Sequence, residues 1–294
     1  MKVKDILGVN PDKKKHRGPR KPRIKGRNLR EGGSMPGVGS IHISEIEPTL
    51  AKLEKELGLD LRNFTLGSVG KKEFSGDIDI AINLKPEQLD DFGKKLQSAP
   101  SIKDMKKTSV FMTSVDIVGY DGNKTKDGIE RTGKVQIDFM PGDPGWMKTY
   151  YHAPHEKDSK YKGVFRNIMI ASIAGRLNVV SSDAKTDDGR PLEQERWMWS
   201  PADGLIRVKR TPVPKKNGEG YTKKNANTII DGPYKNADEI AKQLGLTSGK
   251  DLYSFETLWS AISKKYDKDT VAKIADDFAN NKAVQDIGIP DEIS

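Results

Sequence analysis

Apolar residues in the first half of the chain recur at two spacings, one typical of helices and one typical of strands. Residues 44–57 have apolar side chains at intervals of four, three and four, at Ile46, Leu50, Leu53 and Leu57. This spacing predicts an amphipathic helix, with Ser44 and Glu47 as a capping box at its start and Gly58 as its C-terminal cap. A second helix is predicted over Lys85–Gln97, where acids come early and lysines late, as the helix dipole favours.

Strand-like alternation is clearest at Asp77–Asn83. Asp77 and Asp79 alternate there with isoleucines, so both carboxylates leave the same face of the strand. Residues 109–120 and 133–140 are two further β-rich runs, joined by a polar loop. Helices and strands of this order predict an α+β core.

A Gly-Ser turn precedes the first of these strands. The short apolar run Phe64–Leu66 ends at Gly67 and Ser68, and a Gly- and Lys-containing turn, with a short helix also expected there, leads to the strand at Asp77. Such a turn offers backbone N–H groups and one hydroxyl to a phosphate. Asp77 and Asp79 repel each other and resist burial unless they are solvated or bridged by a cation, and Mg²⁺ suits paired carboxylates. The alternative interpretation is a surface hairpin whose aspartates are merely solvated.

The second half of the chain predicts a helix, a hairpin and then a helical module. The helix is expected at Tyr161–Leu177 and the hairpin within Pro191–Pro214. Three more helices are predicted over Asn236–Leu244, Ser254–Tyr266 and Asp269–Asn280. The hairpin contains two tryptophans and several basic residues, which suits either a nucleic-acid-facing ribbon or a small sheet with one solvated face.

Composition narrows the class of protein. The chain has 294 residues, 34% hydrophobic and 32% charged, which suits a soluble protein with moderate cores. No run of 18 apolar residues is present and the N-terminus lacks an apolar segment, so neither a membrane span nor a signal peptide is expected. The absence of cysteine excludes disulfides, thiolate metal sites and cysteine nucleophiles, and is compatible with the cytoplasmic location that we expect.

Positive charge is concentrated near the N-terminus. The net charge is +9, and residues 11–30 alone contain ten Lys or Arg and one acid, so the remainder sums to about zero. Residues 1–40 are rich in Lys, Arg, Pro and Gly, which predicts a mobile arm. Its segment Lys13–Arg30 is predicted to bind nucleic-acid phosphates. A solubilising tail or contact with an acidic protein surface is the alternative.

The Gly-Ser turn and the paired aspartates together resemble a known superfamily. A strand that ends in Leu66-Gly67-Ser68, followed by Asp77-Ile78-Asp79-Ile80, resembles the DNA polymerase beta-like nucleotidyltransferases, which include poly(A) polymerases, CCA-adding enzymes and nucleotidylating toxins. The resemblance covers residues 44–140. It implies an α+β fold with a polymerase beta-like nucleotidyltransferase core, a mixed sheet with flanking helices, plus a second mixed or helical lobe.

The resemblance also implies a third acid on the later of the two β-rich runs, residues 133–140. Asp116 and Asp138 both stand between apolar residues, and Asp138 matches the family position, with Asp116 as the alternative. Asp77, Asp79 and Asp138 would then be the catalytic residues and the ligands of Mg²⁺, or of Mn²⁺ in its place.

The same resemblance assigns the nucleotide-binding residues. Gly67 and Ser68 would hold phosphates of a nucleoside triphosphate, and Lys71 or Lys72 would neutralise them. An ordinary solvated loop is an equally good interpretation of the two lysines.

These inferences divide the chain into four segments. They are a basic flexible arm (1–40), a catalytic core (41–145), an accessory helix with a small β region (146–230) and a C-terminal helical module (231–294). The expected function is template-independent transfer of a nucleotide from an NTP to an RNA or tRNA 3′ end. The alternatives are nucleotidylation of a protein or small molecule and a non-catalytic nucleic-acid-binding protein on the same fold.

Overall fold

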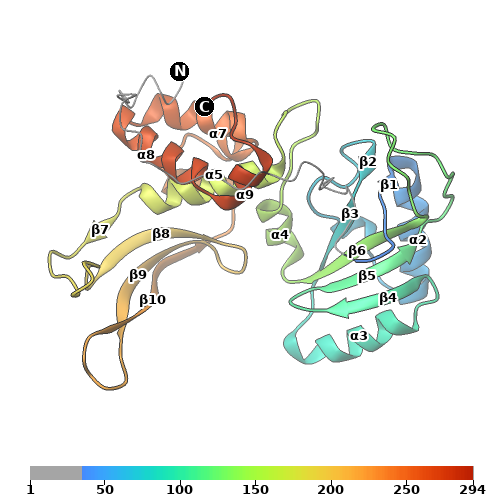
Figure 1. Cartoon of the computed structure of the whole chain (residues 1–294), viewed down its shortest axis with the longest axis horizontal. Coiled ribbons are helices and arrows are strands. Elements are labelled where there is room, and N and C mark those ends of the chain that lie inside the picture. Colours follow the sequence, from blue (N-terminus) through green and yellow to red (C-terminus); the bar gives the residue numbers. More distant parts are fainter. Residues whose placement is uncertain (1–34, 294) are drawn as a thin grey trace, which may run out of the picture. The chain divides into compact units, whose positions relative to one another are not determined.

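The computed structural model of the chain describes residues 35–293. It forms two compact units, which meet in the sequence between Lys160 and Tyr161 (Figure 1). Residues 146–160 therefore belong to the first unit, and the predicted nucleic-acid-binding segment Lys13–Arg30 lies outside the described residues. Within the described part, no helix is long and apolar enough to span a bilayer.

A four-stranded mixed sheet organises the first unit. Its strands lie in the order β3 (Asp77–Ile82), β6 (Lys134–Pro141), β5 (Phe111–Asp116) and β4 (Ile102–Lys107). β3 and β6 run parallel, whereas the other two pairs are antiparallel. β4 was not predicted, because its lysines and aspartate hide the alternation of an edge strand.

Two helices pack on one face of this sheet. They are α2 (Ile43–Leu57) and α3 (Leu89–Ser98), and α3 follows the 3₁₀ turn η2 (Pro86–Gln88). Their apolar sides join the inward side chains of the strands in one core (Figure 1). The largest fully buried members include Leu50, Leu53, Ile78, Ile80, Leu96, Phe111 and Phe139. Both helices were predicted. The opposite face of β3 and β6 carries Asp77, Asp79, Gln136 and Asp138, followed by the apolar Ala81 and Met140.

The start of α2 differs from its prediction. The N-cap is His42, whose partner in the capping box is Glu45, so the box lies two residues before Ser44 and Glu47. Tertiary contacts set this position, because β1 (Ile41–His42) pairs with β2 (Phe74–Ser75) and keeps the chain extended up to His42.

Residues 67–73 form turns instead of the expected short helix. Gly67 and Gly70 have φ values of +65° and +70°, a left-handed conformation that interrupts a right-handed helix. The predicted strand before them is reduced to the 3₁₀ turn η1 (Arg62–Phe64) and a single antiparallel bridge between Thr65 and Ile80.

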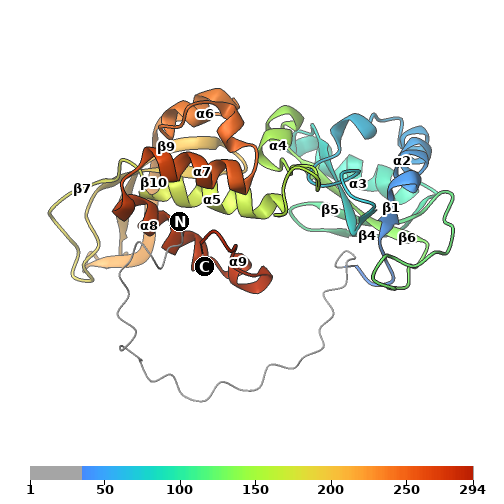
Figure 2. The same ribbon diagram turned by 90° about the horizontal axis from the view of Figure 1, so that it is seen from above.

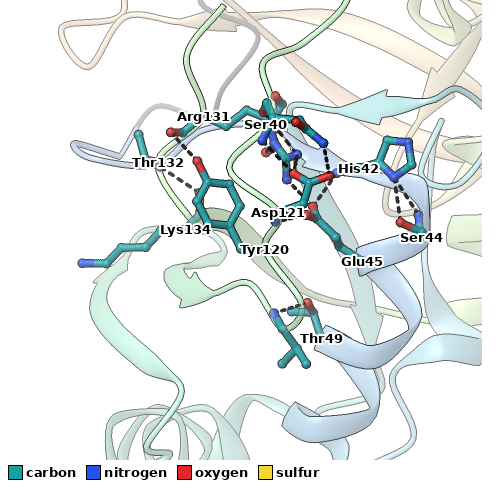
Figure 3. Close-up of polar contacts among 12 residues, drawn as sticks. Ser40, His42, Ser44, Glu45, Thr49, Tyr120, Asp121, Arg131, Thr132 and Lys134 are labelled. Atoms are coloured by element: carbon teal, nitrogen blue, oxygen red, sulfur yellow. Dashed lines mark hydrogen bonds and ion pairs between the residues drawn. The ribbon is translucent and has the colours of Figure 1, made fainter.

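A buried arginine fixes the loop between β5 and β6. Arg131 is ion-paired with Glu45, and its Nη1 lies 3.0 Å from Asp121 Oδ1. Figure 3 shows these residues, which we call the Arg131 cluster, with the Tyr120 hydroxyl donating to the Arg131 carbonyl at 2.8 Å. The Arg131 Nε also donates to the Ser40 carbonyl at 3.1 Å. Each buried charge in this cluster therefore has an opposite charge beside it.

Residues 35–40 also pack on the first unit, although they were predicted to belong to the mobile arm. Met35 is buried, and the Gly39 N–H donates to the Lys134 carbonyl at 2.8 Å. Pro36, Gly37 and Gly39, which suggested mobility, lie in an irregular but packed segment.

The second unit contains an antiparallel sheet in the order β10, β9, β8, β7. Its strands are β7 (Val180–Ser181), β8 (Gln194–Ser200), β9 (Gly204–Pro214) and β10 (Tyr221–Tyr234). β8 and β9 form the predicted hairpin, while β10 was missed because its apolar residues do not alternate regularly.

Helices complete the second unit. α5 (Gly163–Arg176) packs against β8 (Figure 1) and against α8, which Figure 2 shows beside it. The remaining elements are α6 (Ala237–Gln243), η3 (Gly249–Leu252), α7 (Phe255–Lys265), α8 (Lys268–Ala279) and α9 (Lys282–Ile287). The predicted α5, α6, α7 and α8 are confirmed within a few residues, and so is the α+β class.

Candidate functional site

The predicted acids lie on neighbouring parallel strands. In the register of β3 and β6, Asp79 is opposite Asp138 and Asp77 is opposite Gln136. Neighbouring strands are about 4.8 Å apart and residues in register share a face, so Asp79 and Asp138 are adjacent. Ile78 and its apolar neighbours point to the buried core on the other face. The sheet thus brings together three carboxylates, Asp77, Asp79 and Asp138, which we call the acid cluster.

The alternative third acid lies elsewhere on the sheet. Asp116 is opposite Lys134 on β6, four residues before Asp138, which corresponds to about 13 Å along the strand. Its carboxylate is paired with Lys103 at 2.9 Å. Asp116 is therefore held away from the acid cluster with a partner of its own.

Gly67 lies against the acid cluster. The Leu66 N–H donates to the Asp79 carbonyl at 2.8 Å, which brings the chain alongside β3 just before the turn. A Cβ on Gly67 would lie 4.0 Å from Asp79 Oδ2, so the glycine backbone closely approaches that carboxylate. The next residue, Ser68, is exposed, and its carbonyl accepts from the Lys71 N–H at 3.1 Å. Glycine thus leaves space beside Asp79 that a side chain would narrow.

The electrostatics of the acid cluster favour protonation or a cation. Burial, and then the charges of Asp77 and Asp138, raise the pKa of Asp79 to about 7. Burial also raises the pKa of Asp138, against a hydrogen bond from Gln136. Asp77 is exposed at the rim, yet partial desolvation raises its pKa and the Lys72 charge opposes this. In residues 35–293 no ion pair neutralises these acids.

The two lysines of the predicted phosphate site have different surroundings. Lys71 is half-buried, and its Nζ donates to the Ala153 carbonyl at 2.5 Å. Burial lowers the pKa of Lys71. Lys72 acts electrostatically on Asp77. An open depression of about 600 Å³ is lined by Ile43, Gly70, Lys71, Lys72, Glu73, His155, Glu156 and Lys157. The structure therefore brings Lys72 toward the acids and fastens Lys71 to the segment that follows α4 (Pro144–Tyr150).

Gln136 is a site residue that the sequence analysis missed. Its Nε2 donates to Asp138 Oδ1 at 2.9 Å, and its Oε1 accepts from the Met35 N–H at 2.9 Å. The alternation along β6 places Gln136 on the face of Asp138 and so was a usable signal. The contact with Met35 had no signal, because it joins residues 101 positions apart. Gln136 thus orients the Asp138 carboxylate and is itself held by the segment before α2.

An apolar wall borders the acids. Leu66, Ala81 and Met147 form a small buried cluster, with Met140 and Tyr151 packed beside it. Burial, and then the charge of Asp79, raise the pKa of Tyr151, so its hydroxyl lies within the electrostatic reach of that carboxylate. Aromatic and apolar surface beside acids suits a ligand with a flat apolar part and a charged part.

The donor set of the acid cluster fits a hard divalent cation. Carboxylates, water and phosphate oxygens are the ligands that Mg²⁺ prefers, and a cation would relieve the repulsion that raises the pKa of Asp79. Over residues 35–293 no three His, Cys, Asp or Glu side chains are yet arranged for ligation. The carboxylates would therefore have to rotate toward a shared ion, and Asp79 and Asp138 need the smallest movement because they are adjacent.

Comparison with known proteins adds no family to this description. No protein-family model matches the chain, and no curated protein matches it.

Proposed function

We propose that the chain is a Mg²⁺-dependent nucleotidyltransferase that joins the α-phosphate of an NTP to a hydroxyl, at an RNA or tRNA 3′ end and without a template. The bond between the α- and β-phosphates breaks in this step, and pyrophosphate leaves. The observation that carries the proposal is the register of β3 and β6, which sets Asp79 beside Asp138 on the face that carries Asp77. Three carboxylates that no ion pair neutralises within residues 35–293 lie next to a glycine turn, an arrangement that favours a bound cation and can accept phosphate.

The side chains have separate roles in this proposal. Asp77, Asp79 and Asp138 would hold the metal, which, when bound, polarises the phosphoryl group and lowers the pKa of the attacking hydroxyl. Asp138 would receive the proton of that hydroxyl, because Gln136 holds its carboxylate in place. The Gly67 N–H and the exposed Ser68 hydroxyl would bind phosphate oxygens, and Lys72 would add positive charge. The apolar wall with Tyr151 would contact the nucleoside.

A second acceptor is favoured by one observation. Outside residues 11–30 the chain has a net charge of about zero. A groove for a polymer usually carries excess positive charge, so a protein or small-molecule hydroxyl is the other acceptor to test.

The test is incubation of the purified chain with Mg²⁺ and each labelled NTP, with RNA, tRNA or protein as acceptor. The Asp77→Ala/Asp79→Ala variant is run in parallel, and Asp116→Ala is the matched control because it also removes an aspartate from this sheet. We expect label on RNA, lost in the double variant and kept in the control. Label on protein would move the acceptor to the second candidate. Absence of label on every acceptor would overturn the enzymatic proposal.

A further inference from the structure

Two arginines of the second unit are neighbours of like charge. Arg196 on β8 is opposite Val208 on β9, and Arg210 on β9 is opposite Gln194 on β8. Arg196 and Arg210 are therefore diagonal neighbours on one face of the sheet, a separation that long side chains span. Their proximity shows in the pKa of Arg196, which burial lowers first and the charge of Arg210 lowers further.

The Arg196 guanidinium lies against the last turn of α5. A Cβ on Gly175 would be 3.2 Å from Arg196 Nη2, so the absence of a side chain at 175 makes room for the guanidinium. The acid that acts on Arg196 is Asp277, and Arg176 already binds Asp277 through two nitrogens. Within residues 35–293 the Nε atoms of Arg196 and Arg210 are buried without a hydrogen-bond acceptor. Positive charge at this place is thus held by the fold under the electrostatic influence of Asp277, but within residues 35–293 neither arginine has an ion pair of its own.

The other face of the same hairpin shows the contrast. Arg207 is paired with Glu195 at 3.1 Å, and Lys209 is paired with Glu193 at 2.8 Å. These two cations have acidic partners, although they come from the same strand as Arg210. The Nε of Arg207 is also buried without an acceptor, so within residues 35–293 the face next to α5 differs in lacking an ion pair for its two arginines.

We propose that Arg196 and Arg210 form a binding site for the backbone phosphates of single-stranded RNA. Guanidinium groups bind phosphate oxygens with paired, charge-assisted hydrogen bonds, and a phosphate would offset the repulsion between the two arginines. The surroundings favour a polymer over a small phosphate. Apart from the ion pairs of Arg207 and Lys209, residues 194–224 contain six Lys or Arg and two acids, an excess of +4 over the hairpin, the turn that follows it and the start of β10.

The site would hold the acceptor strand and so, for its biological role, rests on the proposed function. Binding itself needs neither NTP nor Mg²⁺. The two proposals can therefore fail separately, since RNA binding is measured without transfer and transfer is measured by label.

The experiment is fluorescence anisotropy of a labelled 20-nucleotide oligouridine with the full chain, over a series of salt concentrations. For Arg196→Gln/Arg210→Gln we expect the Kd to rise about tenfold at about 0.1 M salt. The slope of log K against log salt should become shallower by about 1.4, from about 0.7 for each lost phosphate contact on a single strand. Circular dichroism and thermal unfolding check that the variant is folded.

The matched control is Arg207→Gln/Lys209→Gln, which removes two positive charges from the same hairpin but from the acid-paired face. We expect less than a twofold change in its Kd. If the double arginine variant fails to fold, Arg210→Gln alone keeps the Arg196 contact with α5 and should weaken binding about threefold. Equal losses in variant and control, or an unchanged Kd in the variant, would overturn the proposal. It would also be overturned if inorganic phosphate, but not RNA, distinguished the variant from the wild type by calorimetry.

Discussion

The first unit contains two clusters of charged side chains. Opposite charges are paired in one of them, whereas like charges are gathered in the other. In the Arg131 cluster a buried guanidinium has Glu45 and Asp121 as ion-pair partners. In the acid cluster three carboxylates share one sheet face, and the pKa of Asp79 rises to about 7. The first cluster is complete as the chain folds, whereas the second needs protons or a cation. This difference separates a cluster that fixes a loop from a cluster suited to chemistry.

The strongest test of the comparison is to remove one acid of the acid cluster and one acid outside it. Asp138→Asn keeps the size of the side chain but loses a charge next to Asp79, and we expect at least about a 10³-fold loss of nucleotide transfer, or about 4 kcal/mol of transition-state stabilisation. Asp116→Asn should stay within about twofold, because that side chain is paired with Lys103. Steady-state transfer of label measures both variants. Equal losses would mean that position relative to Asp79 does not matter.

The Arg131 cluster should respond in stability. Glu45→Ala leaves the Arg131 guanidinium buried with Asp121 as its one charged partner within residues 35–293, and we expect the free energy of unfolding to fall by about 3 kcal/mol. Urea unfolding measures this loss. Glu47→Ala is the control, since Glu47 is an exposed residue of the same helix that pairs with exposed Arg62. A similar loss in both variants would show that the buried pair adds nothing special.

Removal of an acid should change the free energy of unfolding in the opposite direction in the acid cluster: it should stabilise the folded chain. The pKa of Asp79 is about 7 in the folded chain and near 3.8 in the unfolded chain. Between these values the folded chain binds the extra proton, so the unfolding free energy of the wild type falls as pH rises through this window and remains low above pH 7. Asp79→Asn lacks this effect and should be more stable than the wild type by about 4 kcal/mol at pH 8, with little difference near pH 4.

Urea unfolding at the two pH values measures that difference, with Asp116→Asn as the control. Added Mg²⁺ should stabilise the wild type at pH 8 and have less effect on Asp79→Asn. A variant that is less stable than the wild type at pH 8 would contradict the repulsion inferred for the acid cluster.

Local pattern was enough to predict much of this structure. The 4-3-4 spacing predicted α2, and alternation predicted both β3 and β6 with their aspartates on one face. The parallel register that sets Asp79 opposite Asp138 could not be predicted, because pairing between residues 59 positions apart depends on the whole sheet. The same holds for Asp116, whose setting in the sequence resembles that of Asp138 and whose distance from Asp79 depends on topology.

Other features were invisible for stated physical reasons. The His42 cap depends on β1 and β2, two-residue strands too short to give a periodic signal. The left-handed glycines at 67 and 70 replaced a helix by turns. The absence of an ion pair for Arg196 and Arg210 within residues 35–293 depends on which acids lie on which face of the hairpin. Glu195, next to Arg196 in the sequence, points to the other face.

The smallest predicted effect concerns Gln136, which contacts the acid cluster through Asp138 and the segment before α2 through Met35. Gln136 donates to Asp138, so Gln136→Leu removes a hydrogen bond that lowers the pKa of that carboxylate. A hydrogen bond worth about 1 kcal/mol corresponds to about 0.7 pH unit, so the acid limb of the pH profile of transfer should move up by about that much. At pH values well above the acid limb, the transfer activity should change less than threefold. Ser114→Ala is the control, because Ser114 is opposite Gln136 on the same face. A loss of activity at all pH values without movement of the limb would mean that Gln136 only supports the packing of Met35.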